Sequence, residues 1–174
     1  MQMASFTAAI ANRGFFYKPH LIKNIHEVDT IPSKYKVKKR TTIDPQHFEP
    51  VIEGMNDVYN YGTATSLKIP DIEICGKTGT AENYTKIDGK RVQLTDHSVF
   101  IAFAPKDNPK IAISVFVENG YWGSRWAGRI ASLMIEKYLK GTITRTDMEN
   151  VVLQGSLEAE YAKPLSSEPF KINQ

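Results

Sequence analysis

The chain has 174 residues, of which 41% are hydrophobic and 24% charged, a composition typical of a folded globular domain and not of a disordered or collagenous chain. Twenty-two basic residues against 19 acidic ones give a formal net charge of +3, which is too small to indicate nucleic-acid binding by itself. The single cysteine, Cys75, excludes an internal disulfide framework and a cysteine-cluster metal site, and no segment approaches the roughly 20 apolar residues that span a bilayer.

The first third of the chain predicts one helix followed by extended segments. Residues 1–13 have the pattern of an amphipathic helix that ends at Gly14, in the C′ position. Residues 15–28 are expected to be extended, because a proline there excludes a helix. Residues 33–42 alternate lysines with other side chains, which predicts a half-exposed strand or hairpin arm with a basic face.

A second helix is expected to begin at Asp44-Pro45, which supplies an N-cap carboxylate and a proline at position N1. It should end at Gly62, and residues 63–67 should add a short turn. The apolar residues at helical spacing are Phe48, Val51, Ile52, Met55 and Tyr59.

Three strands are expected next, over residues 72–80, 97–104 and 111–118. Asp88-Gly89 predicts a hairpin turn within the polar link between the first two. The short links favour an antiparallel meander, so the sequence predicts an α+β fold in which helices pack on an antiparallel sheet.

A last helix is expected from an N-cap at Ser124 to a stop at Gly141. Its expected apolar side consists of Trp126, Ile130, Leu133, Met134 and Tyr138. The sequence thus divides into a domain over 1–140 and a polar tail over 141–174, draped over the body or partly disordered, with a short apolar patch at 148–153.

The most informative motif is Lys77-Thr78-Gly79-Thr80, which closes the first predicted strand. A P-loop is excluded because position 71, where its first glycine should lie, is Asp71 and no helix pattern follows. The motif matches the K-T-G box of serine acyl-transfer enzymes that bind penicillin.

The residue types suit that chemistry. Lys77 is the candidate catalytic residue, since its fixed positive charge serves a substrate carboxylate and the proton network of a nucleophile. Thr78, Gly79 and Thr80 are candidate substrate-binding residues: the hydroxyls can hydrogen-bond a carboxylate, and glycine permits a close backbone approach. An N–H near Thr80 is suited to stabilise an oxyanion.

The surrounding boxes carry a resemblance that covers about residues 1–140. In chain order they are Gln2-Met3-Ala4, Arg13-Gly14, Tyr17-Lys18-Pro19-His20, Glu53-Gly54-Met55, Gly62-Thr63-Ala64, Cys75 to Glu82, Phe100 to Pro105, Asp107 to Ala112 and Val117-Glu118-Asn119-Gly120. The series resembles the C-terminal half of the transpeptidase domain of class B penicillin-binding proteins, most closely the elongation-type D,D-transpeptidase. The resemblance implies part of a penicillin-binding, serine β-lactamase-like transpeptidase fold.

The family nucleophile lies in an S-x-x-K box, and a second box reads S-x-N. The chain contains S-x-x-K once, at Ser33 to Lys36 in a lysine-rich run, and contains no S-x-N. A serine nucleophile needs a buried helix start that lowers the pKa of its lysine, which a solvated lysine strand does not provide. The chain is therefore expected to be a fragment without the nucleophile, inactive alone, and Ser33 is expected to be a decoy.

For the parent protein, the resemblance implies an enzyme that cross-links peptidoglycan stem peptides through a serine acyl-enzyme and is acylated by β-lactams. It implies no cofactor, no metal and no nucleic acid. It also implies a place on the periplasmic side of the bacterial inner membrane, with membrane contact only through the missing N-terminal part. An exposed sheet edge is expected to permit dimers.

Two alternatives remain open. One is a non-catalytic interaction module that binds through the basic run 34–40 and the aromatic residues Tyr121, Trp122 and Trp126. The other is a division-type transpeptidase or a penicillin-sensing domain. The K-T-G box does not distinguish either of these from an elongation-type transpeptidase. His97, which opens the second strand, is expected to make a structural hydrogen bond.

Overall fold

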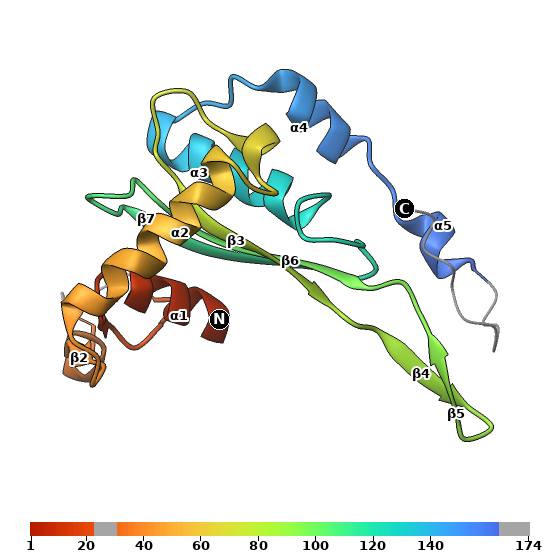
Figure 1. Ribbon diagram of the computed structural model, residues 1–174, viewed down its shortest axis with the longest axis horizontal. Coiled ribbons are helices and arrows are strands. Elements are labelled where there is room, and N and C mark those ends of the chain that lie inside the picture. Colours follow the sequence, from red (N-terminus) through yellow and green to blue (C-terminus); the bar gives the residue numbers. More distant parts are fainter. Residues whose placement is uncertain (23–30, 164–174) are drawn as a thin grey trace. The chain divides into compact units, whose positions relative to one another are not determined.

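The computed structural model describes residues 1–22 and 31–163. Figure 1 labels the helices and strands and colours them in their order along the chain. The elements are α1 (Gln2–Ala11), β1 (Phe15–Phe16), the 3₁₀ turn η1 (Ser33–Tyr35), β2 (Lys39–Arg40), η2 (Pro45–Phe48), α2 (Glu49–Asn60), η3 (Thr65–Leu67), β3 (Cys75–Ala81), β4 (Tyr84–Ile87), β5 (Lys90–Gln93), β6 (His97–Ala104), β7 (Ile111–Val117), α3 (Ala127–Lys140), α4 (Thr146–Leu153) and α5 (Glu158–Tyr161). The predicted α+β class is confirmed.

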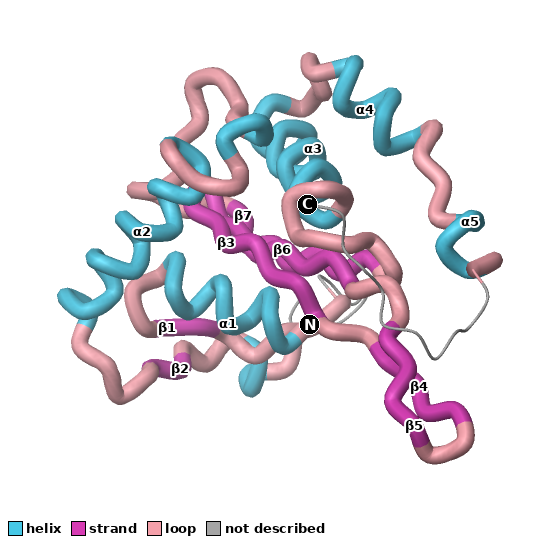
Figure 2. The backbone as a smooth tube through the Cα atoms, turned by 45° about the vertical axis from the view of Figure 1, so that its right-hand side comes forward, coloured by secondary structure: helices cyan, strands magenta, loops and turns pink. Residues whose placement is uncertain are grey.

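The main sheet is antiparallel and has the strand order β3-β6-β7. Strands β4 and β5 pair with each other as a hairpin, inserted between β3 and β6, which extends beyond the ends of those two strands (Figures 1 and 2). Asp88 (φ +51°) and Gly89 (φ +76°) form its turn, with the two positive φ angles that a type I′ turn requires. The three predicted strands and the hairpin turn are therefore confirmed, although the first strand begins at Cys75 and not at residue 72.

The chain divides into two compact units, and each strand of the main sheet contributes residues to both. The first unit consists of Met1–Gly76 and Ile101–Ser114. The second consists of Lys77–Phe100 and the described residues of Val115–Gln174.

In the first unit, one face of α2 closes the hydrophobic core. Ile52, Met55 and Tyr59 are buried at spacings of three and four residues, as an amphipathic helix requires. They belong to a buried set to which η2, α1, β3 and β6 also contribute: Ile10, Ala11, Phe48, Ile52, Met55, Cys75, Ile101 and Phe103, with Tyr59 buried on the same helix face. Each large apolar side chain in this set stabilises the fold by about 1.5–3 kcal/mol.

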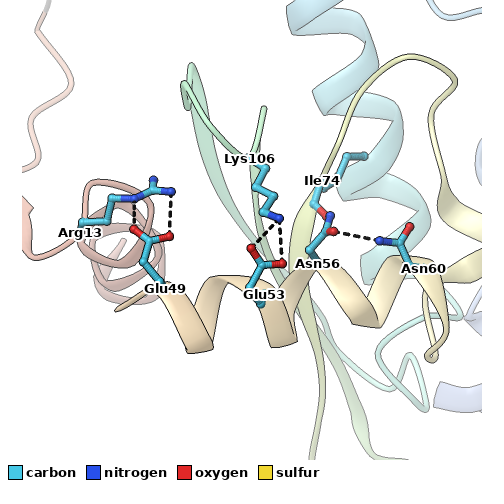
Figure 3. Close-up of polar contacts among 7 residues, drawn as sticks. All are labelled: Arg13, Glu49, Glu53, Asn56, Asn60, Ile74 and Lys106. Atoms are coloured by element: carbon cyan, nitrogen blue, oxygen red, sulfur yellow. Dashed lines mark hydrogen bonds and ion pairs between the residues drawn. The ribbon is translucent and has the colours of Figure 1, made fainter. Parts of the chain in front are cut away.

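The side of α2 that also carries Asn56 and Asn60 makes two ion pairs (Figure 3). Arg13 Nε lies 2.7 Å from Glu49 Oε1, and Lys106 Nζ lies 2.7 Å from Glu53 Oε1. The hydrogen bond from Arg13 holds the pKa of Glu49 below its ordinary value, and the bond to Glu53 raises the pKa of Lys106. Because both pairs are solvent-exposed, they orient α2 more than they stabilise it.

Helix α1 ends one residue earlier than predicted. The N–H of Gly14 donates to the carbonyl of Ala9 (2.8 Å) and that of Arg13 to Ile10 (2.9 Å), which is a Schellman motif. Its left-handed C′ residue is Arg13 (φ +55°), and Gly14 (φ +98°) follows it. The assignment of Gly14 to C′ is therefore wrong by one position.

The strand predicted over residues 33–42 is also wrong. Ser33–Tyr35 is a 3₁₀ turn, and only Lys39–Arg40 forms a strand, paired antiparallel with Phe15–Phe16. The lysine side chains of this segment are exposed, so the alternation produces no buried face that would hold a longer strand in register. Of the predicted extended segment, residues 15–16 form β1, and residues 23–28 lie outside the described part.

Helix α2 begins later than Asp44-Pro45. Pro45–Phe48 forms a 3₁₀ turn, and Asp44 makes no side-chain capping bond to it. A second proline, Pro50, lies in the first turn of the α-helix. Because a proline ring clashes with the carbonyl four residues earlier, Pro50 is tolerated only in the first turn and so limits how early the α-helix can begin.

In the second unit, α3 ends at Gly141 (φ +77°) as predicted, and Leu133 of its predicted apolar side is buried, but Met134 and Tyr138 are not. Met134 and Tyr138 are 52% and 63% exposed. The buried residues of α3 are Ala127, Gly128, Ala131, Ser132, Leu133, Ile135 and Glu136. Small residues thus form much of the buried face, and a search for large apolar residues does not find them.

Beyond α3, the chain is more ordered than a draped polar tail. The patch at 148–153 lies in α4, and Glu158–Tyr161 forms α5; residues 164–174 lie outside the described part. Fully buried Glu136 anchors this segment by accepting from Arg145 Nε (3.0 Å) and Thr144 Oγ1 (2.6 Å). Burial alone would raise the pKa of Glu136, but the hydrogen bonds outweigh it and hold the pKa below its ordinary value.

Candidate functional site

The K-T-G box (Lys77–Thr80) forms the central part of β3. The first two residues of β3, Cys75 and Gly76, are buried, and Lys77 is the first exposed residue of the strand. Because successive side chains of a strand point to opposite faces, Lys77 and Gly79 share one face of the sheet while Thr78 and Thr80 share the other. The four predicted site residues therefore divide between the two faces and share one stretch of backbone.

The ammonium of Lys77 lies close to its own strand. Lys77 Nζ donates to the carbonyl oxygen of Thr78 at 2.8 Å, and both the lysine and Thr80 are exposed. A flexible four-carbon stem lets this ammonium turn toward another acceptor at little cost. The box thus presents a positive charge and two threonine hydroxyls from one short stretch of strand, and each of these groups can bind an anionic ligand.

Strand β3 lies at one edge of the main sheet, with β6 as its neighbour. An edge strand pairs with a neighbouring strand of the sheet on one side only. An extended peptide can add to such an edge through main-chain hydrogen bonds. The K-T-G box therefore combines side-chain recognition of an anion with a backbone suited to a peptide.

Helix α2 holds the chain just before this strand begins. Buried Asn56 donates from Nδ2 to the carbonyl of Ile74 at 3.0 Å, and Asn60 Nδ2 donates to Asn56 Oδ1 at 2.8 Å (Figure 3). A buried amide that makes such bonds is costly to replace, because its partner would be left unsatisfied. Asn56 was not predicted to have a role, since an asparagine in a helix pattern carries no sign of a distant partner.

A second glycine, Gly123, packs directly on the K-T-G box. A methyl group at Gly123 would lie 2.5 Å from the carbonyl oxygen of Val99 and 2.7 Å from the backbone N and O of Gly79. Only glycine permits so close a backbone approach. By contrast, a methyl group at Gly79 would meet Val99 at 3.5 Å, an ordinary contact, so packing alone does not require glycine in the box.

Ser98 of β6 holds the loop that contains Gly123. Its buried hydroxyl donates to the carbonyl of Trp122 at 2.9 Å and accepts from the N–H of Ala127 at 3.1 Å. The second bond caps the N-terminus of α3, the role assigned by prediction to Ser124. That prediction is wrong because the cap comes from a strand 29 residues earlier and not from the residues next to the helix.

A polar network closes the other end of β3 and β6. Asp96 accepts from the backbone N–H of Asn83 (3.1 Å) and from Gln93 Nε2 (2.9 Å). His97 Nδ1 accepts from the N–H of Asn119 at 3.0 Å, so the predicted structural hydrogen bond of this histidine is confirmed. The network fixes the base of the β4–β5 hairpin.

The S-x-x-K sequence lies in surroundings unlike those of an activated nucleophile. Ser33 begins a single 3₁₀ turn that has no buried residue, and Lys36 is also exposed. The turn is therefore unlike the buried helix start that an activated serine needs. The assignment of Ser33 as a decoy stays a prediction.

No group of three or more His, Cys, Asp or Glu in residues 1–22 and 31–163 could hold a metal ion. In the same residues, no helix is both long enough and apolar enough to cross a membrane.

Several proteins with similar sequences are named peptidoglycan D,D-transpeptidase. MrdA of Haemophilus influenzae is 29% identical over 185 aligned positions, which cover 99% of this chain and 28% of that protein. MrdA of Acinetobacter baumannii is 32% identical over 148 positions, covering 80% of this chain and 22% of that protein. The chain thus spans less than a third of the length of these relatives.

Solved structures agree with this similarity. The imipenem acyl-enzyme complex of penicillin-binding protein A from Mycobacterium tuberculosis has a TM-score of 0.62 and 32% identity, over 78% of this chain and 29% of that one. Pseudomonas aeruginosa PBP2 in complex with WCK 5153 has a TM-score of 0.62 and 28% identity, over 83% and 31%.

The model of the penicillin binding protein transpeptidase domain matches residues 1–136. These residues contain the K-T-G box, Ser98 and Gly123, and they make up more than half of the chain. The resemblance drawn from the sequence boxes is therefore confirmed, and the chain belongs to the family of penicillin-binding protein transpeptidase domains.

Proposed function

We propose that the chain supplies one wall of the active site of a serine D,D-transpeptidase that cross-links peptidoglycan stem peptides. The observation that carries this proposal is the K-T-G box on an exposed edge strand, within the 136 residues that match the family. The geometry of that strand suits a peptide that ends in a carboxylate.

In this site, Lys77 is the catalytic residue. Its ammonium stabilises the negative charge that develops when a serine hydroxyl attacks, and it also attracts the substrate carboxylate. Thr78 and Thr80 bind that carboxylate through their hydroxyls, and Gly79 allows the substrate backbone to approach β3.

The nucleophilic serine comes from residues outside these 174. It attacks the stem-peptide carbonyl, forms an ester with the acyl group and expels the terminal residue as an amine. The amine of a second stem peptide then attacks the ester and restores the serine hydroxyl, so the cycle needs no cofactor.

The same site is proposed to be acylated by β-lactams, as the M. tuberculosis relative is by imipenem. A substrate in the cell wall places the reaction on the periplasmic side of the inner membrane. The family resemblance favours the elongation type, because MrdA proteins are among its relatives. At high concentration, the exposed sheet edge is proposed to pair with a second copy.

One experiment tests whether the nucleophile is absent from this chain. The 174-residue chain is incubated with a fluorescent penicillin and run on a denaturing gel, with a Ser33→Ala variant beside it. We expect no labelled band from either. A band from the parent chain that disappears in the Ser33→Ala variant would refute the assignment of Ser33 as a decoy.

A second experiment tests the site in a chain that carries the same residues together with S-x-x-K and S-x-N boxes. Lys77→Ala removes a charge-assisted interaction of about 1.5–3 kcal/mol, so the second-order rate of penicillin acylation should fall by roughly ten- to a hundredfold. Thr78→Val should weaken the binding of β-lactams that carry a carboxylate. Lys36→Ala is the control, and its rate should stay within about twofold of the parent because an exposed charge contributes little. A parent-like rate for Lys77→Ala would reject the proposed function.

A further inference from the structure

The carboxylate of Glu160 on α5 gathers three donors within the second unit. It accepts hydrogen bonds from the hydroxyls of Tyr121 and Thr95 (3.0 Å for Thr95) and from the ammonium of Lys163. Lys163 Nζ also donates to the Tyr121 hydroxyl at 2.9 Å. The Glu160 side chain is only 13% exposed, so a helix of four residues is anchored here by a largely buried charge.

The pKa shifts of Glu160 and Lys163 favour the charged form of each group. Burial would raise the pKa of Glu160, but the bonds from Lys163, Tyr121 and Thr95 outweigh it and lower the pKa. The bonds to Glu160 and Tyr121 raise the pKa of Lys163. Both groups are therefore held in their charged forms, in which their hydrogen bonds are strongest.

Tyr121 belongs to a loop with an unusual backbone. Tyr121 (φ +65°) and Asn119 (φ +53°) both adopt the left-handed conformation, which costs free energy in residues other than glycine. The N–H of Tyr121 donates to the carbonyl of Asp96 at 2.9 Å. Such a loop keeps its shape only when surrounding contacts hold it.

This loop leads directly to the K-T-G box. Two residues after Tyr121, Gly123 packs on the backbone of Gly79, where a methyl group would lie 2.7 Å from N and O. A shift of Tyr121 away from α5 would therefore move the glycine that supports the middle of the box. Helix α5 lies beyond residue 136, where the match to the family ends.

We propose that Glu160 is a positioning residue, which through Tyr121 holds loop 119–123 against Gly79 and so sets the shape of the K-T-G box. The effect on ligand binding rests on the function proposed above, whereas the effect on the backbone does not. The C-terminal segment of this chain thereby controls a site that the family domain carries.

Hydrogen exchange of the 174-residue chain, read by mass spectrometry, tests the effect on the backbone. Glu160→Gln keeps the shape of the side chain and removes its charge, so amides of residues 77–80 and 119–123 should exchange roughly ten times faster. Tyr121→Phe keeps its ring beside Trp122 and Arg125 and should have the same effect. Glu158→Gln is the matched control on the exposed side of α5 and should leave both segments unchanged.

The double variant of Glu160 and Tyr121 should exchange no faster at 77–80 than either single variant, since both act through one contact. Faster exchange confined to α5, with residues 77–80 at the parent rate, would overturn the proposal. It would show that Glu160 anchors its own helix and nothing more.

The chain that carries the nucleophile boxes supplies a second readout. In Glu160→Gln, the dissociation constant of the non-covalent penicillin complex should rise roughly three- to tenfold, while the limiting acylation rate stays within about twofold, because the box binds the carboxylate. Loss of stability alone would not produce this split. If Glu160→Gln had the dissociation constant of the parent while Lys77→Ala still slowed acylation, the positioning role of Glu160 would be rejected and the proposed function would stand.

Discussion

Removal of the Ser98 hydroxyl should destabilise this protein far more than removal of the hydroxyl that the sequence places at the helix start. Ser98 and Ala127 are both fully buried, and the serine oxygen is the acceptor for the alanine N–H at 3.1 Å. In Ser98→Ala that N–H loses its partner in a place without water. An unsatisfied buried donor costs about 1–3 kcal/mol, and the loss of a helix cap about 0.5–2 kcal/mol.

Both estimates describe the same lost acceptor, so they are not added. The same variant loses the bond from Ser98 to the Trp122 carbonyl (2.9 Å), which favours the upper half of the range. We expect the free energy of unfolding to fall by about 2 kcal/mol. For a chain of this length, that corresponds to a drop in Tm of about 4–8 °C.

Ser124→Ala is the control, because it makes the same chemical change at the cap that the sequence predicts. Urea unfolding followed by far-ultraviolet circular dichroism should place this variant within about 0.5 kcal/mol of the parent. The reasoning would be refuted if Ser124→Ala proved as damaging as Ser98→Ala, or if Ser98→Ala cost less than about 0.5 kcal/mol.

Three further predictions concern other parts of the fold. Gly54→Ala in the middle of α2, where a methyl group meets no atom within 4 Å, should stabilise the protein by about 0.5–1 kcal/mol, whereas Gly123→Ala should destabilise it by about 2 kcal/mol or more; urea titrations compare the two. The thiol of Cys75 is fully buried, and burial raises its pKa to about 12, so a thiol reagent at pH 8 should label it only after unfolding. The lowered pKa of Glu136 adds stability above the ordinary glutamate pKa of about 4.3, and this stability is lost as the pH falls through the folded-state pKa. In Glu136→Gln, the free energy of unfolding should therefore fall less between pH 6 and 3 than it does in the parent. An equal fall in both proteins would contradict the ion pair with Arg145.

Much of the fold could be predicted wherever neighbouring residues determine the outcome. Asp88-Gly89 specifies a hairpin turn because both residues tolerate positive φ, and Gly141 ends α3 for the same reason. Strands β6 and β7 were predicted because β-branched and aromatic residues pack well on a pleated sheet. The K-T-G box could be recognised because its four residues are contiguous and follow the family's order of motifs.

The sequence by itself could not identify features made by distant residues. The cap of α3 comes from Ser98, and the backbone of Gly79 is supported by Gly123, because the sheet brings these residues together. The alternating residues 33–42 predicted a strand, but only Lys39–Arg40 pair with another strand. Alternation determines to which side of a strand each side chain points, but it does not determine whether another part of the chain packs against that side.

The C-terminal segment shows the difference most clearly. In the sequence, residues 141–163 are polar and have little periodicity, so they predict a loose tail. In the structure, buried carboxylates at Glu136 and Glu160 find cationic and hydroxyl partners and fix two helices in place. The sequence alone determined the local turns, the strand patterns and the chemistry of the K-T-G box, since these depend on neighbours a few residues apart. Tertiary structure decided which polar groups become buried and paired, since the desolvation of a charge depends on what the whole chain packs around it.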